Sequence, residues 1–432
     1  MNRILLAAAI AAAFSMNVRA DSPVVRGTMG FDPIAASAYA QATSDPAILN
    51  SQPWVIPQGY SQHIVSDESD LNIYPGMSDW TDMNTVNESK KHAGRYMYRT
   101  HEVRPGSNVN AYSGGAVSVV DLKTGLAKII AQRHDWEALD GIVWTPWHSV
   151  LFAEETITAA LGDPAVPQAT SGLLYEMALD KDDPTTAANV TVRPQLGSLS
   201  HEGIEIDAEG NVYVVDEERT GAIYKFVPTT YGDLSAGQLY ALRVMHGAKT
   251  GQAEWVALDM TQVQISARIA ARAVGATPFC RPEDLERIGE TLYAALTCED
   301  VSNPTNTSGA GAVLAVGLGD TPTVSYFVAH GVNVVMENKA ARITGFKSPD
   351  NLANGPDGKL WIVEDNEYSD IWVAEPDTDG DGYSDGVHLF ASLKDVPAEG
   401  TGIYFGKDPH TLYVNVQHSG TGNDKTMAIT KD

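Results

Sequence analysis

Apolar residues in this chain fall mainly in short runs, rich in β-branched and aromatic side chains, that alternate with clusters of Gly, Asp, Asn and Pro. This pattern is typical of an all-β protein. Helical periodicity is scarce by comparison. The best helical segment runs from Thr261 to Val274 and ends at Gly275, and we interpret it as an insertion into the β fold.

A weak repeat organises the predicted strands. Five apolar strands each carry an aromatic residue at a similar place, 10 to 12 residues after the start of a second short strand. The apolar strands cover 148–155, 210–217, 290–296, 358–365 and 410–418. The upstream strands begin at Asp140, Glu202, Glu283, Asp350 and Thr401. An earlier segment, Tyr96–Glu102, is a degenerate sixth candidate.

Such a repeat predicts an all-β fold with a single β-propeller, six-bladed when the degenerate segment is counted, with loop and short-helix insertions. Blades in this number leave no room for a second domain, so we assign residues 21–432 to one propeller domain. A β-sandwich with long loops is the alternative. It would not explain why one class of residue returns to one strand position.

In a propeller, the acidic residues of the repeat would lie close together at the axis. Innermost strands line the axis, so Asp140, Glu202, Glu283 and Asp350 are expected to converge at one end of the channel. Carboxylates this crowded cannot all stay ionised unless cations offset their repulsion, and hard cations with oxygen ligands are the natural solution. Arg281, two residues before Glu283, would add a fixed cation that suits an anionic substrate such as phosphate.

Further acids stand in pairs at the ends of the apolar strands. The pairs are Glu154-Glu155, Asp216-Glu217 and Glu364-Asp365. For any single pair, a solvated strand end is the simpler interpretation. The four homologous acids on the upstream strands favour a metal site instead.

A second metal signal lies in the segment 377–385, which matches the first nine positions of a Ca²⁺-binding loop, with Gly382 at the sharp turn. Its candidate ligands include Asp377, Asp379 and Asp381. The twelfth position is His388 rather than a bidentate Glu, and no flanking helices are evident. We therefore expect a structural calcium loop between strands, with a polar turn rich in Asp and Gly as the alternative.

The first twenty residues predict a secretory signal peptide, because Arg3 precedes an apolar run and residues 18–20 resemble a small-residue cleavage site. The mature protein would then be periplasmic or extracellular. No later stretch is long enough to span a membrane. The formal net charge of −26 disfavours nucleic acid and anionic membranes as partners, and by itself fits a soluble acidic surface as well as clustered metal ligands.

The chain has two cysteines, Cys280 and Cys298, and their midpoint is Gly289 at the tip of a predicted hairpin. Residues equidistant from a hairpin tip face each other, so a cross-strand disulfide is expected in an exported protein. A thiolate metal ligand is the alternative, because Cys280 adjoins the motif that contains Arg281 and Glu283.

Taken in order, these motifs resemble the PhoX family of secreted bacterial alkaline phosphatases, over about residues 95–420. The matching blocks are Thr145-Pro146-Trp147 with Glu154-Glu155, Ser200–Ile204, Arg281–Asp284, Ser348–Leu352 with Gly358–Trp361, and Asn415–His418. The resemblance implies a six-bladed propeller with iron and calcium ions on its axis and phosphomonoesters as substrates.

Carried over residue by residue, the resemblance also implies a site. It implies metal ligation by Glu154, Glu155, Glu202 and Glu283. It further implies phosphate contact by Arg281, with Asp350 lining the site.

One departure from the family pattern concerns Asp140. The family has a cysteine that bridges two irons shortly before the Thr-Pro-Trp block, and here that position holds Asp140. A carboxylate can also bridge two metals, but an oxygen-only site is harder and suits Ca²⁺ better than an Fe³⁺ pair. The chain start also lacks the twin-arginine signal common in that family.

The sequence therefore predicts a secreted, monomeric phosphoric ester hydrolase that acts on a small phosphate ester, with Ca²⁺ and, by resemblance, Fe³⁺ as cofactors. Its chemistry would be metal-assisted hydrolysis, and no Gly-x-Ser-x-Gly elbow competes with that interpretation. A calcium-dependent propeller lactonase and a non-catalytic, calcium-stabilised envelope binding protein are the alternatives. Both would need fewer metal ligands than a phosphatase.

Overall fold

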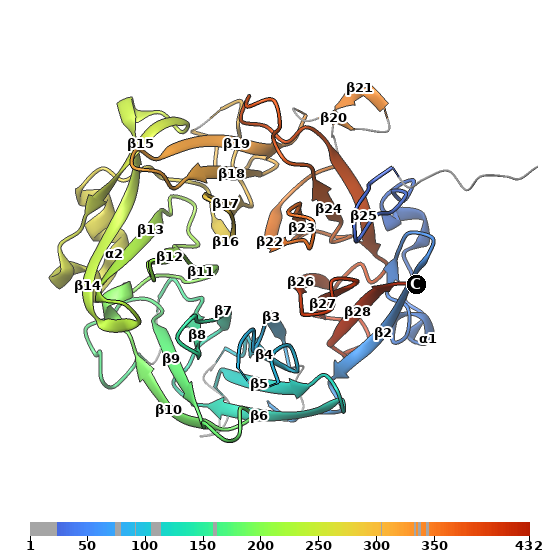
Figure 1. The fold of residues 1–432 in the computed structure, drawn as a ribbon, viewed down its shortest axis with the longest axis horizontal. Coiled ribbons are helices and arrows are strands. Elements are labelled where there is room, and N and C mark those ends of the chain that lie inside the picture. The colour runs from blue at the N-terminus through green and yellow to red at the C-terminus, as the bar shows by residue number, and fades with distance from the viewer. Residues whose placement is uncertain are drawn as a thin grey trace, which may run out of the picture.

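The computed structural model describes residues 24–432 except 74–78, 91, 105–113, 159–161, 304, 332–333, 336–337 and 343–344. The predicted signal peptide, residues 1–20, lies outside the described residues. Figure 1 shows the strands as radial groups around a central axis. The predicted all-β propeller is confirmed.

Six groups of four antiparallel strands make up the described part of the propeller, each counted from the axis outward. The first three groups are β3 (Thr81–Val86), β4 (Tyr96–His101), β5 (Ala116–Asp121) and β6 (Leu126–Gln132); β7 (Leu139–Trp144), β8 (Ser149–Glu154), β9 (Leu174–Leu179) and β10 (Ala187–Val192); and β11 (Ile204–Ile206), β12 (Val212–Val215), β13 (Ile223–Thr230) and β14 (Asp233–Val244). The innermost strands contact one another in the closed order β3, β7, β11, β16, β22, β26 and back to β3.

The remaining three groups complete this ring. They are β16 (Pro282–Ile288), β17 (Thr291–Leu296), β18 (Ala312–Gly317) and β19 (Thr323–Ala329); β22 (Pro349–Asn354), β23 (Leu360–Glu364), β24 (Ile371–Ala374) and β25 (Val387–Leu393); and β26 (Glu399–Phe405), β27 (Thr411–Gln417), β28 (Lys425–Lys431) and β2 (Tyr60–Asp67). The last group pairs β2, near the N-terminus, with β28 at the C-terminus, so the two ends of the chain close the ring.

The other elements extend or cover these blades. β15 (Gly251–Ala257) joins β14 to β19, so the third and fourth groups form one nine-stranded sheet. The outer strand β25 also pairs with β1 (Trp54–Val55) and β20 (Val334–Val335), and β20 pairs with β21 (Asn338–Arg342). The helical elements are η1 (Ala38–Gln41), α1 (Pro46–Leu49), η2 (Pro194–Leu196), η3 (Met245–Gly247) and α2 (Met260–Ala273).

The predicted helical insertion is confirmed as α2. Its N-cap, Asp259, accepts a hydrogen bond from the backbone N–H of Thr261, which satisfies one free donor of the first turn. The buried face, with Val263 and Ala267, packs into the apolar core that blades two and three share. Arg268 of the same helix forms an ion pair with Asp216.

Apolar cores fill the spaces between neighbouring blades. Between the fifth and sixth blades, Trp361 packs edge-on against Phe390 and Phe405, with ring centroids 4.7 and 5.0 Å apart. Between the first and second blades, Trp136 packs against Phe152 at 5.1 Å. These interfaces explain why the aromatic residues of the repeat are conspicuous in the sequence, since each fills the space between two twisted sheets.

Five inner strands share one irregularity that sets the geometry of the axis. Each shifts register, as at a β-bulge, directly after its first residues. The first residues inside the shift are Asp82, Asp140, Glu283, Asp350 and Gly402. The repeat therefore returns a side chain to the axis at a bulge, where the strand turns it inward.

The register also corrects one detail of the predicted repeat. Thr401 was expected to match Asp350, but the residue at the equivalent bulge position is Gly402. A Cβ at Gly402 would lie 2.2 Å from the backbone oxygen of Asp82, and the φ of Gly402 is +57°, so a larger residue would be strained there.

The aromatic residues of the repeat are less uniform than the sequence pattern suggested. Tyr213, Tyr293 and Trp361 each pair with the residue three positions beyond the axial acid of their blade. Phe152 instead pairs with Ile142, only two positions beyond Asp140. Phe152 accordingly packs against the preceding blade, whereas Tyr213, Tyr293 and Trp361 pack against the following one.

The two cysteines form the expected disulfide. Cys280 and Cys298, with Cα atoms 5.2 Å apart, flank the hairpin of β16 and β17, whose tip is at Gly289. Within the described residues no free cysteine remains. The alternative of a thiolate metal ligand is therefore wrong for this structure.

We predict that replacing both Cys280 and Cys298 by Ser lowers the free energy of unfolding by about 3 kcal/mol, because the closed loop spans 18 residues and constrains the unfolded chain. Urea denaturation of the variant and of the wild type would measure this. Treating the wild type with a reductant should produce a similar loss. Equal stability of oxidised, reduced and substituted protein would contradict the prediction.

Candidate active site

Three of the four predicted axial carboxylates meet closely on the axis. Glu202 lies two residues before β11, Glu283 lies on β16 and Asp350 on β22, and one oxygen of each lies within 4.8 Å of the others. All three side chains are buried. Their convergence confirms that the inner strands carry the acidic positions of the repeat to one place.

Asp140, the fourth predicted acid, borders this group on β7. Burial is the largest cause that raises the pKa of Asp140 well above its usual range, followed by repulsion from Asp82 and Glu102, while a hydrogen bond with Glu202 acts in the opposite direction. The pKa of Glu202 is raised by burial and then by Asp140, Glu283 and Asp350. The acids therefore interact as one charged group.

Two further acids complete the layer on the axis, and the sequence pattern missed both. Asp82, on β3, is 6% exposed, and burial and then Glu102 raise its pKa. Glu399, the first residue of β26, has a pKa raised by burial and then by Asp365 and Asp82. Each of the six blades thus supplies one carboxylate to the axis.

Two oxygen atoms of this layer are buried without a hydrogen-bond partner among the described residues. They are Oδ1 of Asp140 and Oε2 of Glu283. A buried carboxylate oxygen without a donor is costly, unless a cation or a proton takes the place of the donor. The residues present therefore fit a cation with oxygen ligands.

A second layer of charges follows at the ends of the exit strands. Glu102, Glu155, Glu217 and Asp365 are equivalent, since the backbone N–H of each donates to the carbonyl of the residue two positions before the axial acid of its own blade. Burial, and then Glu102 and Glu217, raise the pKa of Glu155 well above its usual range. These four acids stand around the axial layer.

The paired acids predicted from the sequence are thus separated by the pleat of the strand. Glu154 turns into its own blade, where it accepts hydrogen bonds from the backbone N–H groups of Glu137 and Leu173 and from the hydroxyl of Tyr175. The first acid of the second pair is also turned away from the axis, because Asp216 forms an ion pair with Arg268 of α2.

Glu364 is likewise bound within its blade. It accepts hydrogen bonds from the backbone N–H of Lys347 and the indole N–H of Trp372. Glu154 and Glu364 therefore stabilise their own blades and Asp216 anchors α2, whereas Glu155, Glu217 and Asp365 form the outer layer of the site.

Two arginines lie among these acids. Arg281 Nε is 2.7 Å from Glu217 Oε1 and 3.1 Å from Glu283 Oε1. Arg104 pairs with both Glu102 and Glu155. Arg104 was not predicted, because its position depends on contacts between blades rather than on the repeat.

Arg281 owes its orientation to the backbone of the repeat. Its φ is +47°, and the equivalent residues Trp80, Ala138 and Ser348 also have positive φ. The strained backbone is therefore a property of four blades, and it directs residue 281 toward the axis.

The contacts of Arg281 leave its terminal nitrogens available. Among the described residues, only Nε of this side chain makes a hydrogen bond or ion pair, and the side chain is 33% exposed. Burial alone would lower the pKa of Arg281, but Glu283 and Glu217 raise it above its usual range. The guanidinium is a permanent cation with two free NH₂ groups beside the acids.

Some of the acidic side chains of the predicted calcium loop also lie close together. Oxygens of Asp377, Asp379 and Asp385 lie within 4.8 Å of one another between β24 and β25. Asp381 accepts a hydrogen bond from the backbone N–H of Tyr383 and is not in this group. A calcium ion in this loop remains a prediction.

Comparison with known proteins assigns the fold and the family. Residues 143–420 match the profile of the family described as "Alkaline phosphatase PhoX". The chain belongs to this PhoX family. The match confirms the resemblance expected from the sequence and the enzyme class, a phosphoric ester hydrolase.

A solved structure shares the fold of this chain. The chain is similar to Pseudomonas fluorescens PhoX in complex with vanadate, a transition state analogue, with a TM-score of 0.67, 20% identity, and 94% and 98% of the two chains covered. It is more distantly similar to a Xanthomonas campestris gluconolactonase, with a TM-score of 0.47, 11% identity, and 90% and 94% covered. No curated protein matches the sequence.

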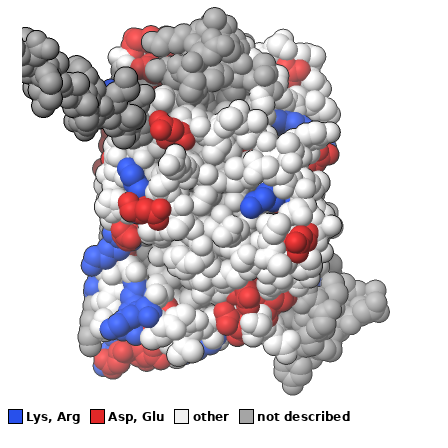
Figure 2. Space-filling view, turned by 90° about the vertical axis from the view of Figure 1, so that its right-hand side faces the viewer, with Lys and Arg blue, Asp and Glu red and all other residues white. Residues whose placement is uncertain are grey.

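The excess of acidic residues does not form one continuous patch on the face of the molecule seen in Figure 2. On the face seen in Figure 2, acidic and basic side chains are scattered among larger uncharged areas. Several acids of this PhoX-family chain are instead buried, among them Asp140, Glu202, Glu283 and Asp350 on the axis. No described helix is both long and apolar enough to cross a membrane.

We predict that the metal-free protein loses stability as the pH rises. Burial is the largest cause that raises the pKa of Glu283 to about 8, and that of Asp284 and Glu205 to about 7. The folded chain therefore holds more protons than the unfolded chain between about pH 4 and pH 8, and its free energy of unfolding falls across that window.

Thermal unfolding in a chelator at about pH 5.5 and about pH 8.5 tests this expectation. In the chelator, the Tm should be lower at the higher pH. When Ca²⁺ is added in excess of the chelator, the Tm should rise more at the higher pH, because ionised carboxylates would bind the metal. A Tm in chelator that rises with pH would contradict it.

Proposed function

We propose that this protein is a secreted, metal-dependent phosphatase that hydrolyses phosphate monoesters at the carboxylate layer on its axis. The observation that carries the proposal is the position of Arg281, whose Nε pairs with Glu283 and whose pKa is also raised by the nearby charges of Glu202 and Asp350. Membership of the PhoX family supports the same reaction.

The axial acids are the proposed metal ligands. Glu202, Glu283 and Asp350 form the closest group, and Asp140 and Glu155 border it. Bound cations would neutralise the buried carboxylates and act as Lewis acids toward the phosphoryl oxygens. The oxygens of Glu154 already accept three hydrogen bonds in the second blade, so we assign Glu154 to positioning of the β8 strand end rather than to the metal.

Ca²⁺ is the proposed principal metal. The donors at the axis are carboxylate oxygens, and both cysteines are held in a disulfide. Such a donor set suits hard cations, and Fe³⁺ would have to bind without a thiolate. Asp140 occupies the place at which the family resemblance implies a bridging cysteine.

Arg281 would hold the substrate. A planar guanidinium with two free NH₂ groups can donate a pair of parallel hydrogen bonds to two oxygens of a phosphate group. Glu217 and Glu283 fix its Nε, so the fork is already oriented before the substrate binds. Export of the chain is part of the proposal, and the disulfide supports it because such bonds persist in oxidising compartments.

Release of phosphate from an aryl phosphate tests the proposal directly. The purified protein should hydrolyse it with Ca²⁺ present and lose activity in a chelator. Arg281→Ala should reduce kcat/KM by about tenfold to a hundredfold, the usual effect of losing a charge-assisted pair of hydrogen bonds, while bound metal is unchanged.

Arg243→Ala is the matched control. Arg243 pairs with Glu254 on the outer rim, with both side chains at least 40% exposed, so this variant should retain full activity. Full activity of Arg281→Ala would contradict a phosphate substrate, and phosphate release that is insensitive to chelation would contradict the metal site.

Asp140 provides a separate test of metal identity. Asp140→Asn should lose metal and activity together, as measured by elemental analysis and the aryl phosphate assay. Asp140→Cys, loaded with Fe³⁺, should gain a visible absorption band, because a thiolate bound to ferric iron absorbs strongly. An intense band of this kind in the wild-type protein would contradict the oxygen-only site.

A further inference from the structure

A second pocket opens on the axis, beyond the carboxylate layer. It has a volume of about 420 Å³, within the range of about 300–1,000 Å³ that is typical of sites for small molecules. Its walls are later residues of the same inner strands, such as Ile204–Ile206 after Glu202 and Asp284–Arg287 after Glu283. None of the four predicted axial acids lines it.

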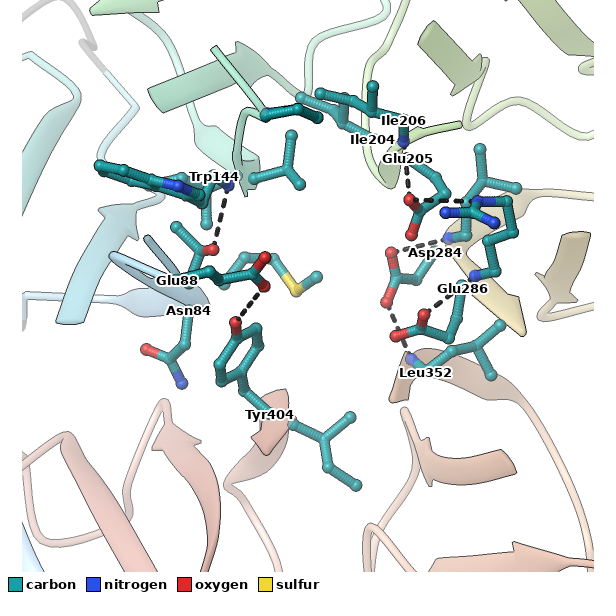
Figure 3. A pocket seen from close by; sticks show the side chains of 18 of the residues that line it. Asn84, Glu88, Trp144, Ile204, Glu205, Ile206, Asp284, Glu286, Leu352 and Tyr404 are labelled. Atoms are coloured by element: carbon teal, nitrogen blue, oxygen red, sulfur yellow. Dashed lines mark hydrogen bonds and ion pairs between the residues drawn. The ribbon is translucent and has the colours of Figure 1, made fainter. Parts of the chain in front are cut away.

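One wall of this pocket is acidic. Figure 3 shows Glu205, Asp284 and Glu286 on one side. Each accepts backbone hydrogen bonds, with Ile206 N–H donating to Glu205 and Leu352 N–H to Asp284. Burial is the largest cause that raises the pKa of all three carboxyls.

Too few cations line the pocket to balance these acids. Arg287 is the one Lys or Arg among the lining residues, and its Nε lies 3.9 Å from Glu205 Oε1. Glu88, on the opposite wall, adds a fourth carboxylate. A cationic ligand is therefore favoured over a neutral or anionic one.

The opposite wall offers apolar surface. Trp144 and Tyr404 lie there with Glu88 in Figure 3, and Tyr404 donates a hydrogen bond to Glu88. Ile142 and Met83 also line the pocket. This wall would contact the carbon chain of an organic ligand rather than a hydrated ion.

Asn84 supplies an independent sign of a missing donor. Its side chain is 3% exposed and lines the pocket, and its Nδ2 donates to Gly402 O and Asn415 Oδ1. Because both partners are acceptors, the amide orientation is fixed, and Oδ1 has no hydrogen-bond partner among the described residues. A ligand with N–H donors could satisfy such a buried acceptor.

We propose that this pocket binds a small organic ammonium ion, namely an aliphatic amine with N–H donors. The acidic wall accepts hydrogen bonds from one ammonium group, the opposite wall contacts the carbon chain, and Asn84, which lies on that opposite wall, accepts from an N–H donor at the other end of the ligand. A bare metal ion fits less well, since the acids of this pocket are not among the described groups whose oxygens come within 4.8 Å of one another.

Isothermal titration of the full mature protein, loaded with Ca²⁺, with putrescine tests the proposal. Putrescine should bind, and 1,4-butanediol, a neutral molecule of the same length, should not. Glu205→Gln keeps an oxygen for Ile206 N–H but removes the charge, so putrescine binding should weaken about tenfold or more. Arg287→Gln removes the competing cation and should strengthen binding severalfold.

Asp182→Asn is the control, because this side chain is 84% exposed and lies outside the pocket. Its affinity for putrescine should equal that of the wild type. The proposal would be overturned if the wild type did not bind putrescine or bound the diol equally well. It would also be overturned if the Glu205→Gln and Arg287→Gln variants both bound putrescine with the affinity of the wild type. Displacement of bound putrescine by micromolar Ca²⁺ would also overturn it, in favour of a second metal site.

Discussion

Repulsion among buried carboxylates on the axis is the constraint on which the rest of the structure depends. Closing six blades into a ring brings Glu202, Glu283 and Asp350 within 4.8 Å of one another, with Asp140 and Asp82 beside them. Their raised pKa values and the unpartnered oxygens of Asp140 and Glu283 have this single origin. A chain that must bury these acids needs cations to compensate them, and this need makes the site suitable for binding metals and an anion.

The scaffold around the axis opposes this repulsion. Pairing of β2 with β28 closes the ring, and the aromatic cores around Trp361 and Trp136 hold the blades in contact. Glu154 and Glu364 also contribute, because their hydrogen bonds link strand ends within the blades. The acidic layer is thus held by interactions that do not themselves involve a metal.

The two sections of the axis differ in chemistry although the same strands line both. The blades that direct Glu202 and Glu283 toward the carboxylate layer also present Glu205 and Glu286, three residues later, to the second pocket. Arg281 and Arg104 accompany the first layer, whereas Arg287 alone accompanies the second. Arg281, together with the proposed cations that would offset the acids, favours an anionic substrate in the first section, whereas the acids of the second pocket favour a cationic ligand.

Much of this arrangement was determined by the sequence itself. Strand length, turn residues and the repeated acid are local or periodic features, so the all-β propeller, four axial carboxylates and the disulfide could all be predicted from them. Symmetry about one axis then required the repeated acids to meet. Asp82 does not stand out in the repeat, because a longer connection separates β3 from β4 than separates the first two strands of the other blades.

Only the tertiary structure decided which member of each acidic pair faces the axis. The pleat and the bulge turn Glu154 into its blade and Glu155 toward Arg104, and a sequence pair carries no sign of that difference. Likewise, the pairing of β26 with β27, which the sequence does not show, places Gly402 rather than Thr401 at the bulge of the sixth blade. Contacts between blades join residues far apart in the chain, so they follow from ring closure and packing rather than from any local pattern.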